Sequence, residues 1–139
     1  MGHRRRAREI ALQVLFQIDM TGIDPHEALD LFWSHFDAPE NAREFAAMLI
    51  LGTTEHLEAI DTAIRDCSDH WSLERMARVD KNILRMAVFE LLYLEEIPPK
   101  ATLNEAIDLG KTFGSENSGS FVNGILDAFY SRMQTGHED

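Results

Sequence analysis

The chain has 139 residues, of which 45% are apolar and 27% are charged. This composition is typical of a single globular domain, residues 1–139, and it excludes a disordered chain. The longest uncharged apolar stretch lies between Glu44 and Glu55, and its ten residues are about half of a membrane span. The lone Cys67 excludes an internal disulfide, and no signal-peptide pattern opens the chain, so we expect a cytoplasmic protein.

The charge is strongly acidic overall but unevenly distributed. Twenty-four acidic residues face 13 basic ones, for a net charge of −11. Four of the basic residues fall within the first eight positions: Arg4, Arg5, Arg6 and Arg8. An acidic body with a basic tip predicts that the tip contacts an anionic partner.

The first half of the chain has helical periodicity. Apolar residues recur at helical spacing from Ala7 to Ile18, and Thr21-Gly22 ends that segment. Asp24 is the predicted N-cap of a second helix, with Pro25 at its first position. Asp37-Ala38-Pro39 separates this helix from a long third segment, residues 39–68, in which Gly52-Thr53-Thr54 predicts a kink or break.

The second half is helical as well. A short helical turn is expected at residues 73–77, and Asp80 is the predicted cap of a strongly apolar, central helix. Ile97-Pro98-Pro99 ends that helix, and Gly114 is the predicted C′ residue of the next one. A loop over residues 115–120 then leads into the last helix. We therefore predict an all-α fold of about seven helices, two of them short.

Enzyme motifs fail when they are tested against the sequence. Gly110-Lys111-Thr112 imitates the end of a phosphate-binding loop, but Glu105 stands where that motif needs glycine, and no strand precedes it. The six histidines form no HExxH pattern, and no GxSxG motif exists. Glu55, Glu58 and Asp61 share a helical face, which favours a solvated acidic stripe over a metal site. We expect neither enzymatic activity nor a cofactor.

The arginine cluster is the first informative feature. Cations at a helix N-terminus oppose the helix macrodipole, so natural helices usually carry acids there. A nucleic-acid phosphate would accept hydrogen bonds from both the guanidinium groups and the helix N–H groups. The alternative is an exposed arginine end that serves only solubility.

The second informative feature is Phe121-Val122-Asn123-Gly124. Val122 belongs to the apolar stripe of the last helix, whereas Phe121 lies about 100° away from that stripe. Phe121 is therefore either a core residue of a second layer or a face on which an unpaired base stacks. Gly124 weakens a helix, which suggests close approach of another helix or of a ligand. Trp33 and Trp71 are expected to be packing residues.

Three ordered blocks of the sequence resemble the NusB family of bacterial transcription antitermination factors. The family pattern RRRARE is met by Arg4–Glu9, and the V-[DE]-K-x-[IV]-L-R-x-A-x-[FY]-E-L pattern is met by Val79–Leu91. The third block covers Pro98–Gly114 and continues in the F-[VI]-N-G-[VI]-L-D pattern at Phe121–Asp127. The resemblance is weakest between positions 21 and 72.

The resemblance implies seven helices in two packed halves and a function in transcription. It implies binding of boxA, a single-stranded element of ribosomal RNA transcripts, together with the small-subunit ribosomal protein NusE. The complex would join other Nus factors on RNA polymerase. The matching RNA-binding positions are Arg4, Arg5, Arg6, Arg8, Lys100, Lys111, Phe121 and Asn123, and those facing NusE are Phe16, Glu74 and Asp80. Ser120 replaces a basic residue that many relatives carry.

Two other classes of protein remain open at this point. NusB-like domains also form the N-terminal, RNA-binding part of ribosomal RNA cytosine methyltransferases, but a chain ending at Asp139 leaves no room for a catalytic domain. A purely structural helical oligomer would make the arginine cluster accidental. The sequence is compatible with a monomer and with a homodimer.

Overall fold

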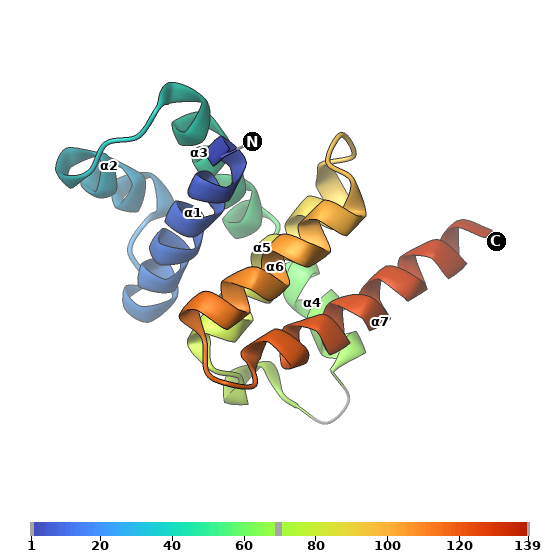
Figure 1. Ribbon diagram of the computed structural model, residues 1–139. Helices are drawn as coiled ribbons and strands as arrows, with labels where there is room; N and C mark the ends of the chain where they lie inside the picture. The colour runs from blue at the N-terminus through green and yellow to red at the C-terminus, as the bar shows by residue number, and fades with distance from the viewer. Residues whose placement is uncertain (1, 69–70, 139) are drawn as a thin grey trace. The chain divides into compact units, whose positions relative to one another are not determined.

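A computed structural model describes residues 2–68 and 71–138 of the chain, and these residues form helices and no strand (Figure 1). The helices are α1 (Gly2–Thr21), α2 (Pro25–His35), α3 (Glu40–Glu55), α4 (Leu57–Cys67), the 3-10 helix η1 (Leu73–Arg75), α5 (Arg78–Tyr93), α6 (Pro99–Phe113) and α7 (Ser118–Glu138). The prediction of an all-α fold is confirmed. The chain divides into two compact units, Met1–His56 and Leu57–Asp139. No helix in the described part is long and apolar enough to cross a membrane.

The first unit is built from α1, α2 and α3, each of which contacts the other two. The predicted stripe of α1 is buried at Ala7, Ile10 and Val14, and α3 contributes the fully buried Leu49 and Ile50. Burial of these apolar side chains is the main source of the unit's stability, because it removes their surfaces from water.

The turn between α1 and α2 forms as its sequence predicts. Gly22 ends α1 with a φ of 73°, a conformation that favours glycine. The Asp24 carboxylate accepts hydrogen bonds from the backbone N–H groups of His26 and Glu27, at 3.0 and 3.2 Å. Pro25 occupies the first turn of α2, where its missing N–H removes no helical hydrogen bond.

The long third segment breaks, as predicted, into α3 and α4, and the break falls at His56. The Thr54 hydroxyl donates to the carbonyls of Ile50 and Leu51, at 2.9 and 3.1 Å. Such bonds back to the preceding turn bend a helix. The His56 N–H still bonds to the Gly52 carbonyl at 3.1 Å, so α3 ends one residue after the predicted kink.

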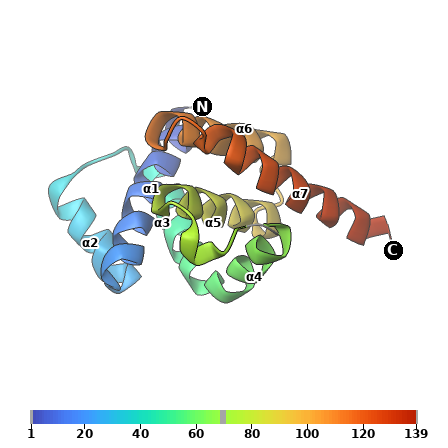
Figure 2. The ribbon, with the colours of Figure 1, turned by 90° about the horizontal axis from the view of Figure 1, so that it is seen from below.

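The second unit is arranged around α5, which contacts α4, α6 and α7 (Figure 2). Every residue of α5 from Asn82 to Glu90 is buried, in agreement with the predicted central helix. α6 and α7 also pack against each other, and α7 reaches α4. The apolar surface of α5 is therefore covered on several sides. A helix with only a narrow apolar stripe would need to be covered on one side.

Three predicted helix ends differ from the structure. α5 begins at Arg78 with Ala77 as its N-cap, so Asp80 lies inside the first turn and is not the cap. The last helix begins at Ser118, within the stretch predicted as loop. Gly114 has a φ of −93°, so it is not a left-handed C′ residue. Its glycine is instead required by contact, because a Cβ there would overlap the Ser118 side chain.

Candidate nucleic-acid interface

The arginine cluster lies on the first two turns of α1. The helix begins at Gly2, so Arg4 falls in the first turn and Arg5, Arg6 and Arg8 follow it. Only the first turn of a helix has N–H groups without helical partners. Arg4 lies nearest in sequence to these N–H groups, and joint binding of one anion by the N–H groups and the guanidiniums stays a prediction.

The four arginines fall into two pairs. Arg4 and Arg8 extend over the ring of Phe45 on α3, with guanidinium carbons 5.6 and 5.5 Å from the ring centre. Arg8 is buried, with 4% of its surface exposed, whereas Arg5 and Arg6 are exposed. Arg6 also approaches the Glu9 carboxylate at 3.9 Å. Arg5 and Arg6 are thus presented to solvent, while Arg8 is held against the unit's own core.

A tight corner between α6 and α7 positions one of the predicted RNA-binding residues, Lys111. A Cβ on Gly110 would lie 3.2 Å from the Gly119 nitrogen, so only glycine allows the two helices to approach this closely. A Cβ on Gly119 would lie 3.0 Å from Cγ of Lys111, so the lysine stem crosses the first turn of α7. Phe121 follows two residues later, where the helix has turned by about 200°. Its side chain therefore lies on a different face of α7 from the one that Lys111 crosses.

Phe121 is half-buried and contacts an aromatic partner that the sequence did not predict. The Trp71 ring lies edge-to-face with it, with the ring centres 5.9 Å apart and an angle of 84° between the planes. Trp71 is 53% exposed, so it packs against Phe121 with only part of its surface. Trp33, by contrast, is half-buried between Phe32 and the Arg43 guanidinium.

The rest of the FVNG block faces solvent. Asn123 and Gly124 are both exposed. No atom of the described chain lies within 4 Å of the position that a Cβ on Gly124 would take. Close approach of another helix is therefore excluded as the reason for this glycine, within the part of the chain that the structure describes. Approach of a ligand remains a prediction.

Lys100 lies away from the corner that holds Lys111. Both are exposed residues of α6, but Lys100 is the second residue of that helix and Lys111 is near its end. Eleven residues of helix separate them by roughly 16 Å along the axis. Among residues 2–68 and 71–138, no group of three acidic, histidine or cysteine side chains could hold a metal ion.

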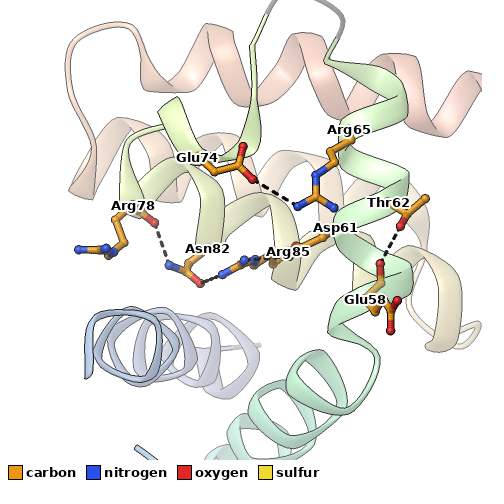
Figure 3. Close-up of polar contacts among 8 residues, drawn as sticks. All are labelled: Glu58, Asp61, Thr62, Arg65, Glu74, Arg78, Asn82 and Arg85. Atoms are coloured by element: carbon orange, nitrogen blue, oxygen red, sulfur yellow. Dashed lines mark hydrogen bonds and ion pairs between the residues drawn. The ribbon is translucent and has the colours of Figure 1, made fainter. Parts of the chain in front are cut away.

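The predicted partner-facing residues occupy three different environments. Phe16 is half-buried on α1 of the first unit, and Asp80 is buried in the first turn of α5. One oxygen of the Asp80 carboxylate, Oδ1, has no hydrogen-bond partner among the described residues. Glu74 is exposed and pairs with Arg65, whose Nη2 lies 3.4 Å from Oε1 (Figure 3). The pKa of Glu74 is lowered, chiefly by a hydrogen bond from its own backbone N–H and then by Arg65.

A buried polar network joins α4 to α5, and the sequence analysis missed it. The Arg85 guanidinium donates twice to the Asp61 carboxylate, at 2.8 and 2.9 Å. It also donates to the Asn82 side-chain oxygen at 3.4 Å, and the Asn82 amide donates to the Arg78 carbonyl at 2.9 Å (Figure 3). The prediction of a solvated acidic stripe is thus wrong for Asp61. The apolar residues Ile60 and Ile64 next to it were the sequence feature that could have predicted the burial of Asp61.

Glu90, near the end of α5, is a second buried acid. It is 2% exposed, and its Oε1 accepts a hydrogen bond from the Thr102 hydroxyl at 2.9 Å. This bond links α5 to α6. Glu90 therefore belongs to the interior of the second unit and is not available to a partner.

Comparison with known proteins shows which family this chain resembles in sequence and in fold. The family model for NusB matches residues 5–131. The chain is 55% identical over 139 residues to the transcription antitermination protein NusB of Syntrophus aciditrophicus, covering all of this chain and 86% of that protein. T. maritima NusB has a TM-score of 0.82 and 40% identity, covering 91% of this chain and 89% of the other.

A third relative was solved as an assembly. In a crystal structure of the antitermination factors NusB and NusE in complex with double-stranded RNA, one chain has a TM-score of 0.85 and 33% identity. The match covers 95% of this chain and 98% of that one. The fold and the basic first helix thus place the chain among the helical transcription antitermination proteins. The chain belongs to the NusB family.

Proposed function

We propose that this protein is a transcription antitermination factor that binds boxA RNA together with NusE and joins the Nus factors on RNA polymerase. The observation that carries the proposal is the match over 95% of the chain to a structure of NusB with NusE and RNA. The exposed arginines of α1 support it, because RNA phosphates are the anions that such a cluster contacts. The protein would act as an adaptor and not as an enzyme.

The proposed RNA contacts divide between charge and shape. Arg4, Arg5 and Arg6 would neutralise phosphates, with Arg8 holding this end of α1 against Phe45. At the α6–α7 corner, Lys111 would contact a phosphate, while the Asn123 amide can donate to and accept from a base edge. Lys100 would contact RNA only if the strand continues along α6. Ser120, which is exposed, offers a hydroxyl where many relatives offer a cation.

The residues proposed to face NusE are Phe16 in the first unit and Glu74 and Asp80 in the second unit. The net charge of −11 favours a basic ribosomal protein and disfavours nonspecific RNA binding elsewhere on the surface. The exposed Glu74 supports this role, because its carboxylate can meet a basic side chain of NusE directly. Asp80 is buried, so NusE would reach its unpaired Oδ1 only if binding opened the first turn of α5.

Titration of boxA-like single-stranded RNA, with and without saturating NusE at two salt concentrations, tests the proposal. We expect NusE to tighten RNA binding, because both ligands would occupy one small protein. Equal RNA affinity in the two titrations would contradict the cooperative model. A mismatched single strand and a duplex of the same sequence serve as controls, and tighter binding of the duplex would contradict a single-stranded target.

A further inference from the structure

In the aromatic pair at the start of α7, the exposed ring is that of Trp71 and not that of Phe121. Phe121 is therefore poorly placed to stack on a base by itself. Phe121 is half-buried, while the indole of Trp71, edge-to-face with it at 5.9 Å, is 53% exposed. We propose that Trp71 provides the face on which an unpaired RNA base stacks, and that Phe121 is a positioning residue that holds the indole ring. This inference rests on the proposed RNA-binding function.

The geometry of the pair supports this division of labour. In an edge-to-face pair, the two planes are nearly perpendicular, here at 84°, so each ring restricts the rotation of the other. Phe121 is further held because its helix begins at the tight glycine corner of α6 and α7. An indole fixed in this way is preorganised for stacking, which lowers the entropy that binding must overcome. The exposed part of the Trp71 ring does not stabilise the folded chain, which points to a role in binding.

Gly124 keeps the surface beside the pair open. It lies one turn after Phe121, so the two residues are neighbours on the same face of α7. Alanine would be a better helix former there, and neither a positive φ nor a close contact within the described chain requires glycine. The absent side chain therefore leaves room for a flat ligand that lies over the helix beside the two rings.

The polar residues next to the pair favour a nucleotide over an apolar protein partner. Lys111 is exposed, and its stem crosses Gly119 at the start of α7, on a different face of that helix from Phe121. A phosphate of the same RNA strand can meet Lys111 while a base stacks on Trp71. Ser120 and Asn123, which are both exposed, surround Phe121 with polar groups. A protein partner would need a wider apolar surface than one exposed indole provides.

Fluorescence offers a direct test, because the chain has two tryptophans. In the Trp33→Phe variant, Trp71 is the remaining emitter, and we expect single-stranded boxA-like RNA to quench it as the base stacks. In the Trp71→Phe variant, Trp33 reports instead, and we expect the same RNA to change its emission little. RNA binding measured independently by gel shift confirms that both variants are saturated.

Affinity provides the second readout. Trp71→Ala is expected to weaken RNA binding by about five- to 150-fold, the loss typical of one stacked base, without changing the salt dependence. Trp71→Phe retains a flat ring and should recover part of that loss. Gly124→Leu fills the open surface and should weaken binding as well. Because Trp71 and Gly124 are exposed, the urea midpoints of these variants should stay near that of the wild type.

The possible failures are distinguishable. If the wild type binds RNA but Trp71→Ala binds equally well and Trp71 is not quenched, the stacking role is wrong and the proposed function stands. If Phe121→Ala weakens binding while Trp71→Ala does not, Phe121 itself is the stacking face. If the wild type binds neither the single strand nor the duplex, with or without NusE, the proposed function and this inference both fail.

Discussion

Arginine has opposite roles in the two units of the molecule. On α1 of the first unit, Arg5 and Arg6 project into solvent, where they can meet an anion from outside. In the second unit, the side chain of Arg85 is only 10% exposed and binds the Asp61 carboxylate with two nitrogens. The difference shows that the residue type alone does not indicate function. What matters is whether the fold buries the guanidinium against a carboxylate, since Arg6 has the Glu9 carboxylate at 3.9 Å and yet stays exposed.

Helix α4 repeats the contrast within two of its own turns (Figure 3). Asp61 binds Arg85 in a buried, bidentate pair, whereas Arg65, one turn later, meets the exposed Glu74 through a single 3.4 Å contact. A buried charge that loses its partner pays the full cost of desolvation, while an exposed one returns to water. The buried pair should therefore be far more sensitive to substitution.

The largest expected effect comes from breaking the buried pair on one side. Arg85→Met leaves the Asp61 carboxylate buried without a cation, which typically lowers the free energy of unfolding by about 3–5 kcal/mol. Urea denaturation followed by circular dichroism measures this loss. The exposed equivalent, Arg65→Met, is the matched control and should leave the urea midpoint nearly unchanged.

A double variant shows whether the loss comes from the unpaired charge. Asp61→Leu combined with Arg85→Met replaces both partners by apolar side chains, which is often neutral for a buried ion pair. We expect the double variant to recover most of the stability lost in Arg85→Met. If it is as unstable as the single variant, the packing of the Arg85 stem, and not its charge, explains the loss.

The next effect concerns the arginines of α1 and is read in RNA binding. Replacing Arg4, Arg5 and Arg6 by Ala should make the slope of log K against log salt shallower by about 2, at about 0.7 for each phosphate contact on a single strand. Matched and mismatched RNA should lose affinity alike, because phosphate contacts carry little sequence information. The helix should persist, since Ala is a strong helix former.

Arg8→Ala is the internal control for that experiment. Arg8 is buried over Phe45, so its loss should lower the free energy of unfolding by about 1–2 kcal/mol, the range of a desolvated cation–π contact. The salt slope should change little. An unchanged slope in the triple variant, or a slope that changes only when Arg8 is removed, would contradict the proposed division of the cluster.

Much of the fold could be predicted because its signals are local. The apolar stripe of α1, the Asp24 cap and the Pro25 start each depend on residues within one or two helical turns. The predicted Asp80 cap failed because Ala77, whose backbone carbonyl accepts the Lys81 N–H at 2.9 Å, begins the helix without any side-chain cap. A helix that is buried on several sides forms even without a side-chain cap, since packing supplies most of its stability.

The candidate site was less predictable because its decisive contacts join distant positions. Asp61 and Arg85 are 24 residues apart, and the residues near Asp61 in the sequence do not indicate that Arg85 is its partner. Trp71 and Phe121 are farther apart still, and they meet only because the segment before η1 and helix α7 belong to the same compact unit. Sequence periodicity placed Phe121 about 100° from the core stripe, and the structure leaves this residue half-buried. The periodicity could not reveal that the exposed ring of Trp71 lies next to Phe121.

The smallest expected effect is electrostatic and sharpens the contrast between the two pairs of α4. The pKa of Glu74 lies below its ordinary value of 4.5, first because its own backbone N–H bonds to the carboxylate and then because Arg65 stands beside it. Arg65→Gln removes the second cause and leaves the first. The pKa should therefore rise in this variant but remain below the ordinary value, as measured by carbon-detected NMR of the Glu74 carboxyl during an acid titration.

The sign of the accompanying stability change follows from the same shift. A carboxyl whose pKa is lower in the folded state stabilises the fold above its unfolded pKa, and this contribution is lost as the pH falls through the folded value. The small advantage of the wild type over Arg65→Gln should thus be present near neutral pH and vanish in acid below the wild-type pKa of Glu74. An unchanged Glu74 pKa in Arg65→Gln would show that the 3.4 Å contact is not maintained in solution. The exposed pair of α4 would then differ from the buried pair in occupancy as well as in strength.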